Sequence, residues 1–262
     1  MRKKNVICAM LILIFTVGIA VGVWQIYQQF HEYSEGADSY TELEEYVKLP
    51  EEPEDDSEDT SIPSESGETE SVRWWPEVDF EALREINPDL VGWIYIEGTD
   101  INYPVVQGAD NQYYLKHLFT GEWNSSGCIF LDARNSADLS DRNSILYGHH
   151  MKDGSMFHGL MEYKSQEYYD EHPTVLFLTP DANYEVKIFA GYVASVDADA
   201  WTVGFSSDSE FEEWLQEAQE RSCFTSEITP AVTDRILTLS TCSYEFNNAR
   251  FVLLGSLERI EG

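Results

Sequence analysis

The chain has 262 residues, with 16 Lys or Arg against 48 Asp or Glu and a formal net charge of −32 at pH 7. Its length allows one large folded domain or two small ones. So acidic a chain argues against a nucleic-acid-binding protein, because such a protein needs a basic face to displace counterions from phosphates.

An uncharged apolar segment lies near the N-terminus. Residues 2–4 are basic, and no charged residue occurs from 5 to 30. About 20 apolar residues suffice for a helix to cross a bilayer core, so residues 1–30 are predicted to form a cytoplasmic tip and a single transmembrane anchor. The basic start places the N-terminus in the cytoplasm and the rest of the chain outside the cell. The alternative is a cleaved signal peptide, whose apolar core usually has only about 7 to 15 residues.

The next segment is strongly acidic. Between residues 31 and 72 the chain has sixteen Asp or Glu and one Lys, together with many Ser, Thr and Pro. Low hydrophobicity combined with like charge cannot bury enough apolar area to offset chain entropy. Residues 31–73 are therefore predicted to be a disordered acidic linker that holds a folded domain, residues 74–262, away from the membrane.

Short strands dominate the chain after residue 74. Asp79 is a candidate cap for a helix over 80–86, and Ser207 or Asp208 for a helix over 207–221. Helical spacing also occurs at 112–119 and 155–164. The predicted strands are 92–96, 101–106, 127–131, 144–147, 174–178, 184–196, 235–241 and 249–257. Many short strands with few helices predict a mainly β fold, a closed or nearly closed barrel with peripheral helices.

The four cysteines do not form a disulfide framework. Cys8 lies in the predicted membrane span, which leaves an odd number: Cys128, Cys223 and Cys242. A bridge between Cys128 and Cys223 stays open, although the apolar neighbours of Cys128 favour a buried, unreactive thiol. Cys242 is then the candidate for a reactive thiol, because a free cysteine outside the cell is a liability unless it is used.

Three residues from separate parts of the chain form a candidate acyl-transfer site. Cys242 ends an alternating strand at a predicted barrel rim, and its thiolate is the candidate nucleophile. His149 follows another short strand, after Tyr147 and Gly148, and is the candidate acid and base. Arg250, eight residues past the cysteine, is the candidate for stabilising an oxyanion. Taken singly, each has a structural alternative: a buried core cysteine, a solvent-facing loop histidine and a surface salt bridge.

A zinc site built from His149, His150 and His158 is the metal alternative. Adjacent histidines in an extended segment point in opposite directions. The chain has neither an HExxH motif nor paired CxxC motifs. We therefore expect no metal and no cofactor.

Several motifs together resemble the sortase transpeptidases of Gram-positive bacteria. Thr238-Leu239-Ser240-Thr241-Cys242, with Tyr147-Gly148-His149 upstream and Arg250 downstream, is similar to the motifs that carry the catalytic residues of this family. The resemblance spans about residues 80 to 257. It is closest to class B, through the segments 109–115, 127–135 and 147–157 and through the helix over 207–221 between the strands before the cysteine.

The resemblance implies an eight-stranded sortase β-barrel in which His149, Cys242 and Arg250 form the catalytic triad. It implies a cysteine transpeptidase that cleaves a Thr–Gly or Thr–Asn bond in the C-terminal sorting signal of a surface protein. A thioacyl intermediate on Cys242 is then passed to an amine of a peptidoglycan precursor. The implied partners are the sorting-signal peptide, this amine and the membrane. The calcium site of class A is not expected. The residues implied for the substrate groove are Asn111, Leu115, Ser240, Thr241 and Tyr244.

Three other functions stay open. Transfer to water describes a membrane-anchored cysteine protease, and transfer to a protein lysine describes a pilin-polymerising sortase. In the third, a non-enzymatic surface adhesin or binding module, the three residues are incidental. Partitioning between the acceptors depends on how the groove excludes water and admits an amine, which is a property of the tertiary structure.

Overall fold

The computed structural model describes residues 2–50 and 75–260, and residues 1, 51–74 and 261–262 lie outside this description. Eight strands close into a barrel in the order β10-β8-β7-β3-β4-β5-β6-β9, which confirms the predicted mainly β fold. The strands are β3 (Leu90–Tyr95), β4 (Asn102–Val106), β5 (Ile129–Leu131), β6 (Asn143–Tyr147), β7 (Thr174–Leu178), β8 (Asn183–Ser195), β9 (Ile236–Cys242) and β10 (Ala249–Ile260).

Two of the strand pairs in this barrel are parallel, β4 with β5 and β6 with β9. Parallel strands end at the same edge of a sheet, so the C-terminal ends of β6 and β9 meet at one rim. The register pairs Tyr147 with Ser240. This pairing brings the segment after Tyr147 next to the end of β9, although almost a hundred residues separate them in sequence.

The strands around β9 are buried on both faces. Inside the barrel, Leu237 and Leu239 pack in the large apolar core with Phe251 of β10. On the outside, α4 (Asp208–Arg221) covers the sheet with an apolar stripe that includes Phe211 and Trp214. A strand covered on both faces holds its terminal residue rigidly, and this is the structural setting of Cys242.

The two helix caps predicted from sequence are present. Asp79 accepts a hydrogen bond from Ala82 N at the start of α2 (Phe80–Ile86), and Ser207 accepts one from Glu210 N at the start of α4. The other helical segments differ from the prediction in length or type. They are the 3₁₀ helices η2 (Tyr113–Leu115), η3 (His158–Lys164) and η4 (Asp199–Trp201), and the short helix α3 (Gln166–Glu171), which was not predicted.

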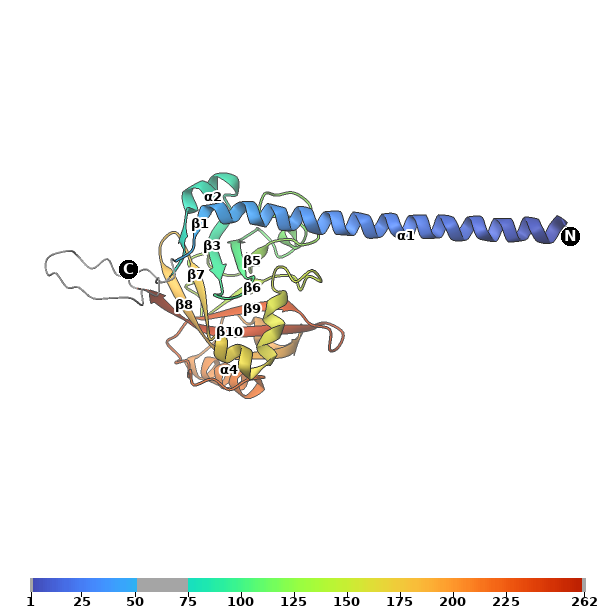
Figure 1. Ribbon diagram of the computed structural model, residues 1–262. Helices are drawn as coiled ribbons and strands as arrows, with labels where there is room; N and C mark the ends of the chain where they lie inside the picture. Colours follow the sequence, from blue (N-terminus) through green and yellow to red (C-terminus); the bar gives the residue numbers. More distant parts are fainter. Residues whose placement is uncertain (1, 51–74, 261–262) are drawn as a thin grey trace, which may run out of the picture.

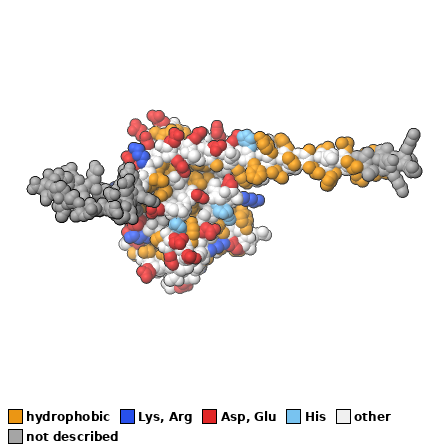
Figure 2. All heavy atoms as spheres, in the orientation of Figure 1, with side chains coloured by type: hydrophobic (Ala, Val, Ile, Leu, Met, Phe, Trp, Pro, Cys, Tyr) orange, Lys and Arg blue, Asp and Glu red, His pale blue; other side chains and the backbone are white. Residues whose placement is uncertain are grey.

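Helix α1 (Arg2–Leu43) projects from the barrel as a long rod (Figure 1). Apolar side chains are exposed along its projecting part (Figure 2), and by length and composition α1 is a candidate membrane span. The C-terminal part of α1 does not project. It lies against the barrel, where Tyr40 and Leu43 are buried.

This docking corrects the predicted linker. Residues 31–50 form the end of α1, the 3₁₀ helix η1 (Glu44–Tyr46) and strand β1 (Val47–Lys48), which pairs with β2 (Glu77–Val78). Residues 51–73, the rest of that linker, lie outside the described part of the chain. The prediction was wrong over 31–50 because a charge count averages over a window. It missed that Tyr33, Tyr40 and Leu43 share one face of the helix at helical spacing and pack on the barrel.

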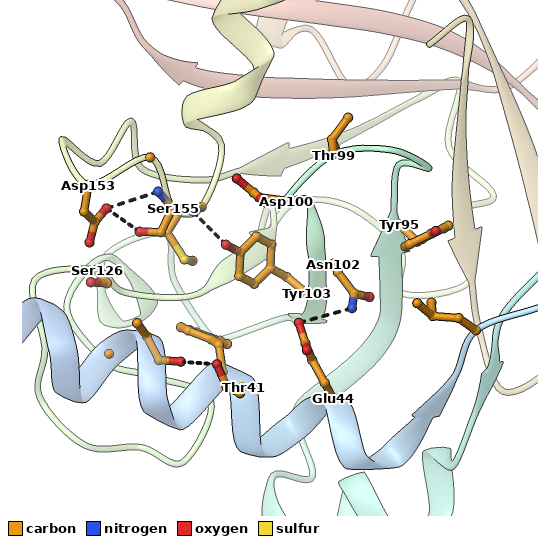
Figure 3. Close-up of a pocket in the computed structure, with 16 residues that line it drawn as sticks. Thr41, Glu44, Tyr95, Thr99, Asp100, Asn102, Tyr103, Ser126, Asp153 and Ser155 are labelled. Atoms are coloured by element: carbon orange, nitrogen blue, oxygen red, sulfur yellow. Dashed lines mark hydrogen bonds between the residues drawn. The ribbon is translucent and has the colours of Figure 1, made fainter. Parts of the chain in front are cut away.

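Hydrogen bonds join α1 to the loop that precedes β5. Tyr40 Oη donates to Gly127 O at 2.5 Å, and Asn124 Nδ2 donates to Glu32 O at 2.8 Å. Figure 3 shows the adjoining pocket, of about 510 Å³, where Asn102 of β4 donates to Glu44 at 3.4 Å. The helix is therefore attached to the barrel by buried contacts as well as by the chain.

Candidate active site

Cys242 is the last residue of β9, half-buried at the rim, and its register partner across β10 is Arg250. The next pair along the ladder, Ser243 and Ala249, is joined by a hydrogen bond of 3.0 Å from Ser243 N to Ala249 O. Bonded and non-bonded pairs alternate in an antiparallel ladder, so Cys242 and Arg250 form a non-hydrogen-bonded pair. The side chains of such a pair lie close together on one face of the sheet.

His149 lies two residues beyond the end of β6. Gly148 N donates to Ser240 O at 3.1 Å, which extends the pairing of β6 with β9 by one residue. A Cβ on Gly148 would lie 2.5 Å from Ile129 Cδ1 and 2.6 Å from the ring of Phe157. A glycine can be needed at a position because another segment approaches closely or because the backbone has a positive φ. At Gly148 the structure supports close approach, because Gly148 is not among the described residues with positive φ.

The imidazole of His149 is held by the segment that covers the rim. Its Nε2 lies 2.8 Å from the backbone oxygen of Leu115. A carbonyl oxygen can only accept, so Nε2 carries a proton in this arrangement. Leu115 ends η2 and is therefore both a lining residue of the site and the partner that orients the histidine.

One pocket of about 510 Å³ brings these groups together. Four of the five predicted groove residues line it, and the fifth, Tyr244, does not; its ring is exposed and packs against His150 at 5.3 Å. Among the described residues that line the pocket, none is Asp or Glu. The full lining is Asn111, Leu115, Phe130, Tyr147, Gly148, His149, Val196, Trp201, Ser240, Thr241, Cys242 and Arg250.

Five of these lining residues were not among the predicted site residues: Tyr147 and Gly148, which belong to the motif before His149, and Phe130, Val196 and Trp201. Val196 directly follows β8, so the end of the long predicted strand at 184–196 was a usable signal. Phe130 belongs to the predicted strand at 127–131, but the pattern did not show which face it presents. Trp201 lies in η4, a turn with no strong sequence pattern, and donates from Nε1 to Ser240 Oγ at 3.3 Å.

A buried carboxylate supports one wall of the pocket. Asp132 is fully buried and accepts two hydrogen bonds from the Arg134 guanidinium, at 2.9 and 2.8 Å, and one from Tyr147 Oη at 2.8 Å. Burial opposes the charged form, but the hydrogen bonds outweigh it and lower the pKa of Asp132 to about 2. Arg134 also donates to Trp201 O at 3.2 Å. Tyr147 and Trp201, which both line the pocket, are thereby held by one ion pair.

Arg250 makes no ion pair with any acid in residues 2–50 or 75–260. Its Nη1 donates to Ala249 O at 2.9 Å. The surface salt bridge that was the structural alternative for this arginine is therefore absent from the described part of the chain. Its charge stays available to the pocket, where it favours an anion such as a thiolate or an oxyanion.

The other cysteines and histidines are arranged differently from the alternatives considered above. Cys128 is buried, and burial raises the pKa of its thiol to about 12; Cys223 is exposed, and both are free, so they form no bridge. The three histidines of the zinc alternative do not converge. Their rings contact three different backbone oxygens. His149 Nε2 contacts Leu115 O, His150 Nδ1 contacts Cys242 O, and His158 Nδ1 contacts Met151 O.

Comparison with known proteins gives consistent matches. Residues 94–258 match the Sortase domain family. Sortase B of Listeria monocytogenes serovar 1/2a is 41% identical over 177 residues, covering 67% of this chain and 72% of that protein. The Staphylococcus aureus sortase B–substrate complex is 35% identical, with a TM-score of 0.67, covering 70% of this chain and 85% of that one. Sortase B from B. anthracis in complex with AAEK1 is 33% identical, with a TM-score of 0.71, covering 88% and 100%.

Proposed function

This chain belongs to the sortase family, within it to class B, and from this premise we propose that Cys242, His149 and Arg250 are its catalytic residues. The family makes it a cysteine transpeptidase. The observation that carries the assignment is that three residues from different parts of the sequence line one pocket, with Cys242 and Arg250 in direct cross-strand register. A buried structural cysteine would not lie in a pocket beside a histidine and an arginine that makes no ion pair within residues 2–50 and 75–260.

The thiol proton is taken up by His149, and the thiolate of Cys242 attacks the carbonyl carbon of the scissile peptide bond. The carbonyl oxygen becomes an oxyanion, which Arg250 stabilises. The intermediate collapses to a thioester as the peptide C–N bond breaks, and the leaving amine takes the proton from His149. An incoming amine then attacks the thioester and gives its proton to the neutral imidazole, and the thiolate leaves.

The peptide substrate is the C-terminal sorting signal of a surface protein. Support comes from the solved Staphylococcus aureus sortase B–substrate complex, a relative with the same fold. Asn111, Leu115, Ser240 and Thr241 line the pocket together with the triad, which supports the proposal that they contact the peptide. Tyr244 lies outside the pocket, so its role would be limited to contacts at the edge of the groove.

The acceptor is an amine of a peptidoglycan precursor, and the enzyme acts at the outer face of the membrane. A membrane location is supported by α1, whose apolar part projects from the barrel (Figure 2). The basic residues before it favour a cytoplasmic N-terminus and an extracellular barrel. Arg250 lines the pocket, and none of the described lining residues is Asp or Glu. This positive charge suits an acyl-enzyme mechanism better than a metal-dependent hydrolase.

A quenched sorting peptide, incubated with and without an oligoglycine or a diaminopimelate-type amine, tests this function. We expect cleavage by the wild type, an amine adduct when the acceptor is present, and a covalent adduct on Cys242 by mass spectrometry. Cys242→Ala should be inactive and Cys223→Ser, at the exposed free cysteine, should be fully active. Hydrolysis without an adduct would indicate a protease, and an active Cys242→Ala would contradict the site.

A further inference from the structure

His150 is a half-buried histidine next to the catalytic site whose ring contacts the backbone of the nucleophile. Its Nδ1 lies 2.9 Å from Cys242 O. Because a carbonyl oxygen only accepts, Nδ1 carries a proton and donates. The ring does not line the pocket, so it is not placed to touch the substrate.

The carbonyl of Cys242 lies at the point where the pairing of β6 with β9 stops. Cys242 and Arg250 form a non-hydrogen-bonded pair, so the carbonyl of Cys242 points away from β10 and towards β6. On that side Ser240 O accepts a hydrogen bond from Gly148 N, and the next acceptor along β9 is Cys242 O. The backbone of His150 instead bridges to Met156, and its ring donates to Cys242 O in place of a strand partner.

The ring of His150 is itself held on two sides. It lies edge-on to His158 at 4.6 Å, and His158 Nδ1 is fixed by Met151 O at 2.6 Å. Tyr244 packs on it from the turn between β9 and β10. An ion pair between Lys164 and Glu245 joins this turn to η3. Such a packed ring provides a donor at a defined position.

We propose that His150 is a positioning residue: by binding the carbonyl of Cys242 it fixes the last peptide unit of β9 and hence the direction of the thiol. The inference rests on the proposed role of Cys242 as the nucleophile. Without this hydrogen bond Cys242 O has no partner on the β6 side. Only the bond from Ser243 N to Ala249 O then holds the same peptide unit, which leaves it free to tilt. A displacement of the attacking atom by about 1 Å can lower a rate about 100-fold.

Three substitutions of His150 separate the effect of its hydrogen-bond donor from the effect of its ring packing. His150→Asn keeps an N–H in nearly the place of Nδ1, His150→Phe keeps a ring without a donor, and His150→Ala removes both. We expect kcat to fall about 10- to 100-fold in His150→Phe and His150→Ala with KM within about twofold, and His150→Asn to recover most of kcat. The matched control is His158→Phe, which keeps the packing and should change kcat little.

Failure of the proposed function would show as an active Cys242→Ala variant, whereas failure of the proposed role of His150 would show only in the His150 variants. If Cys242→Ala is inactive while His150→Phe has full kcat, His150 is not a positioning residue. A loss confined to KM, or an Asn variant as slow as Ala, would also overturn the proposal.

A measurement on the wild type covers the case in which a variant does not fold. Nitrogen-15 NMR of histidine-labelled protein should show His150 with its proton on Nδ1. Alkylation of Cys242 should shift this resonance more than that of His172. His172 is the control, because its ring contacts Glu97 O and not the backbone of Cys242. A His150 ring protonated only on Nε2 would contradict the hydrogen bond.

Discussion

Cys242 and Arg250 are direct partners across β9 and β10 at the rim of the barrel. Because they form a non-hydrogen-bonded pair, their Cβ atoms lie about 4.5 to 5.5 Å apart on the same face. This register therefore sets the distance between the proposed nucleophile and the guanidinium. A substrate carbonyl attacked by the thiol would come within reach of the guanidinium without movement of the strands.

Replacing Arg250 by lysine should impair the chemical step more than substrate binding. Lysine keeps the charge but loses the planar set of donors that can bind an oxyanion from a fixed direction. We expect kcat to fall about 10²- to 10³-fold, the usual effect of removing one oxyanion donor. Steady-state kinetics with the quenched peptide measure it. Arg259→Lys, on the same strand at its far end, is the control and should be unchanged.

Gly148→Ala should destabilise the protein. The new methyl group would overlap Ile129 and Phe157, both fully buried, and overpacking of a core typically costs about 1 to 3 kcal/mol. The free energy of unfolding from urea titration measures it. At Gly159 the nearest atoms to a new Cβ are 3.8 Å away, so Gly159→Ala should not destabilise the protein. Equal stabilities of the two variants would contradict the close approach at Gly148.

The buried Asp132 should make stability depend on pH at the acid end. Its pKa is lowered from 3.8 to about 2 in the folded protein. A depressed folded-state pKa stabilises the protein above about pH 4, and the contribution is lost as the pH falls through 2. We expect the stability difference between wild type and Asp132→Asn to shrink by about 2 kcal/mol between pH 5 and pH 2. A difference that does not vary with pH would show that the carboxylate is not stabilised.

Tyr40→Phe should weaken the docking of α1 on the barrel. The variant leaves Gly127 O without the hydroxyl that binds it at 2.5 Å, at a cost of about 1 to 3 kcal/mol for a buried group. Hydrogen exchange of residues 32–43, with the full chain in detergent micelles, reports the effect locally. Tyr27→Phe, on the exposed part of α1, is the control. Fast exchange of this segment already in the wild type would contradict its packing.

The cysteines outside α1 should differ in reactivity. Cys128 is buried and its thiol pKa is raised to about 12, so it should resist N-ethylmaleimide at pH 8. Cys223 is exposed and Cys242 is half-buried, and both should be labelled. Peptide mapping by mass spectrometry measures the three sites, and in denaturant all should react. Labelling of Cys128 in the folded protein would show that the core around it opens.

Much of the local structure follows from patterns of a few residues. The caps at Asp79 and Ser207 are present, and strand β7 spans the residues predicted for it, because capping and alternation depend on near neighbours. The helix predicted over 112–119 was wrong in extent. Only Tyr113–Leu115 is helical, because the residues that follow pair with 122–124: Leu118 N donates to Glu122 O, and Lys116 O accepts from Asn124 N. The short α3 had too few residues to produce a periodic signal.

The acidic segment shows where sequence patterns fail. Residues 31–50 pack against the barrel through Tyr40 and Leu43, although their composition is that of a linker. Burial on one side of a helix is decided by the surface it meets, and that surface comes from residues far away in the sequence. The side-chain bond from His150 to Cys242 O was missed for the same reason, since it depends on how β6 and β9 end relative to each other.

By itself, the sequence determined the chemical groups, the residues able to form strands and caps, and, through its motifs, the resemblance to a family. Only the tertiary structure decided that β6 and β9 run parallel and in register, so that His149 reaches the pocket of Cys242. It likewise decided that Tyr244 lies outside this pocket and that α1 packs on the barrel. The physical reason is that strand propensity and capping act over a few residues. Register, burial and the direction of a side chain depend on contacts between segments that only the folded chain brings together.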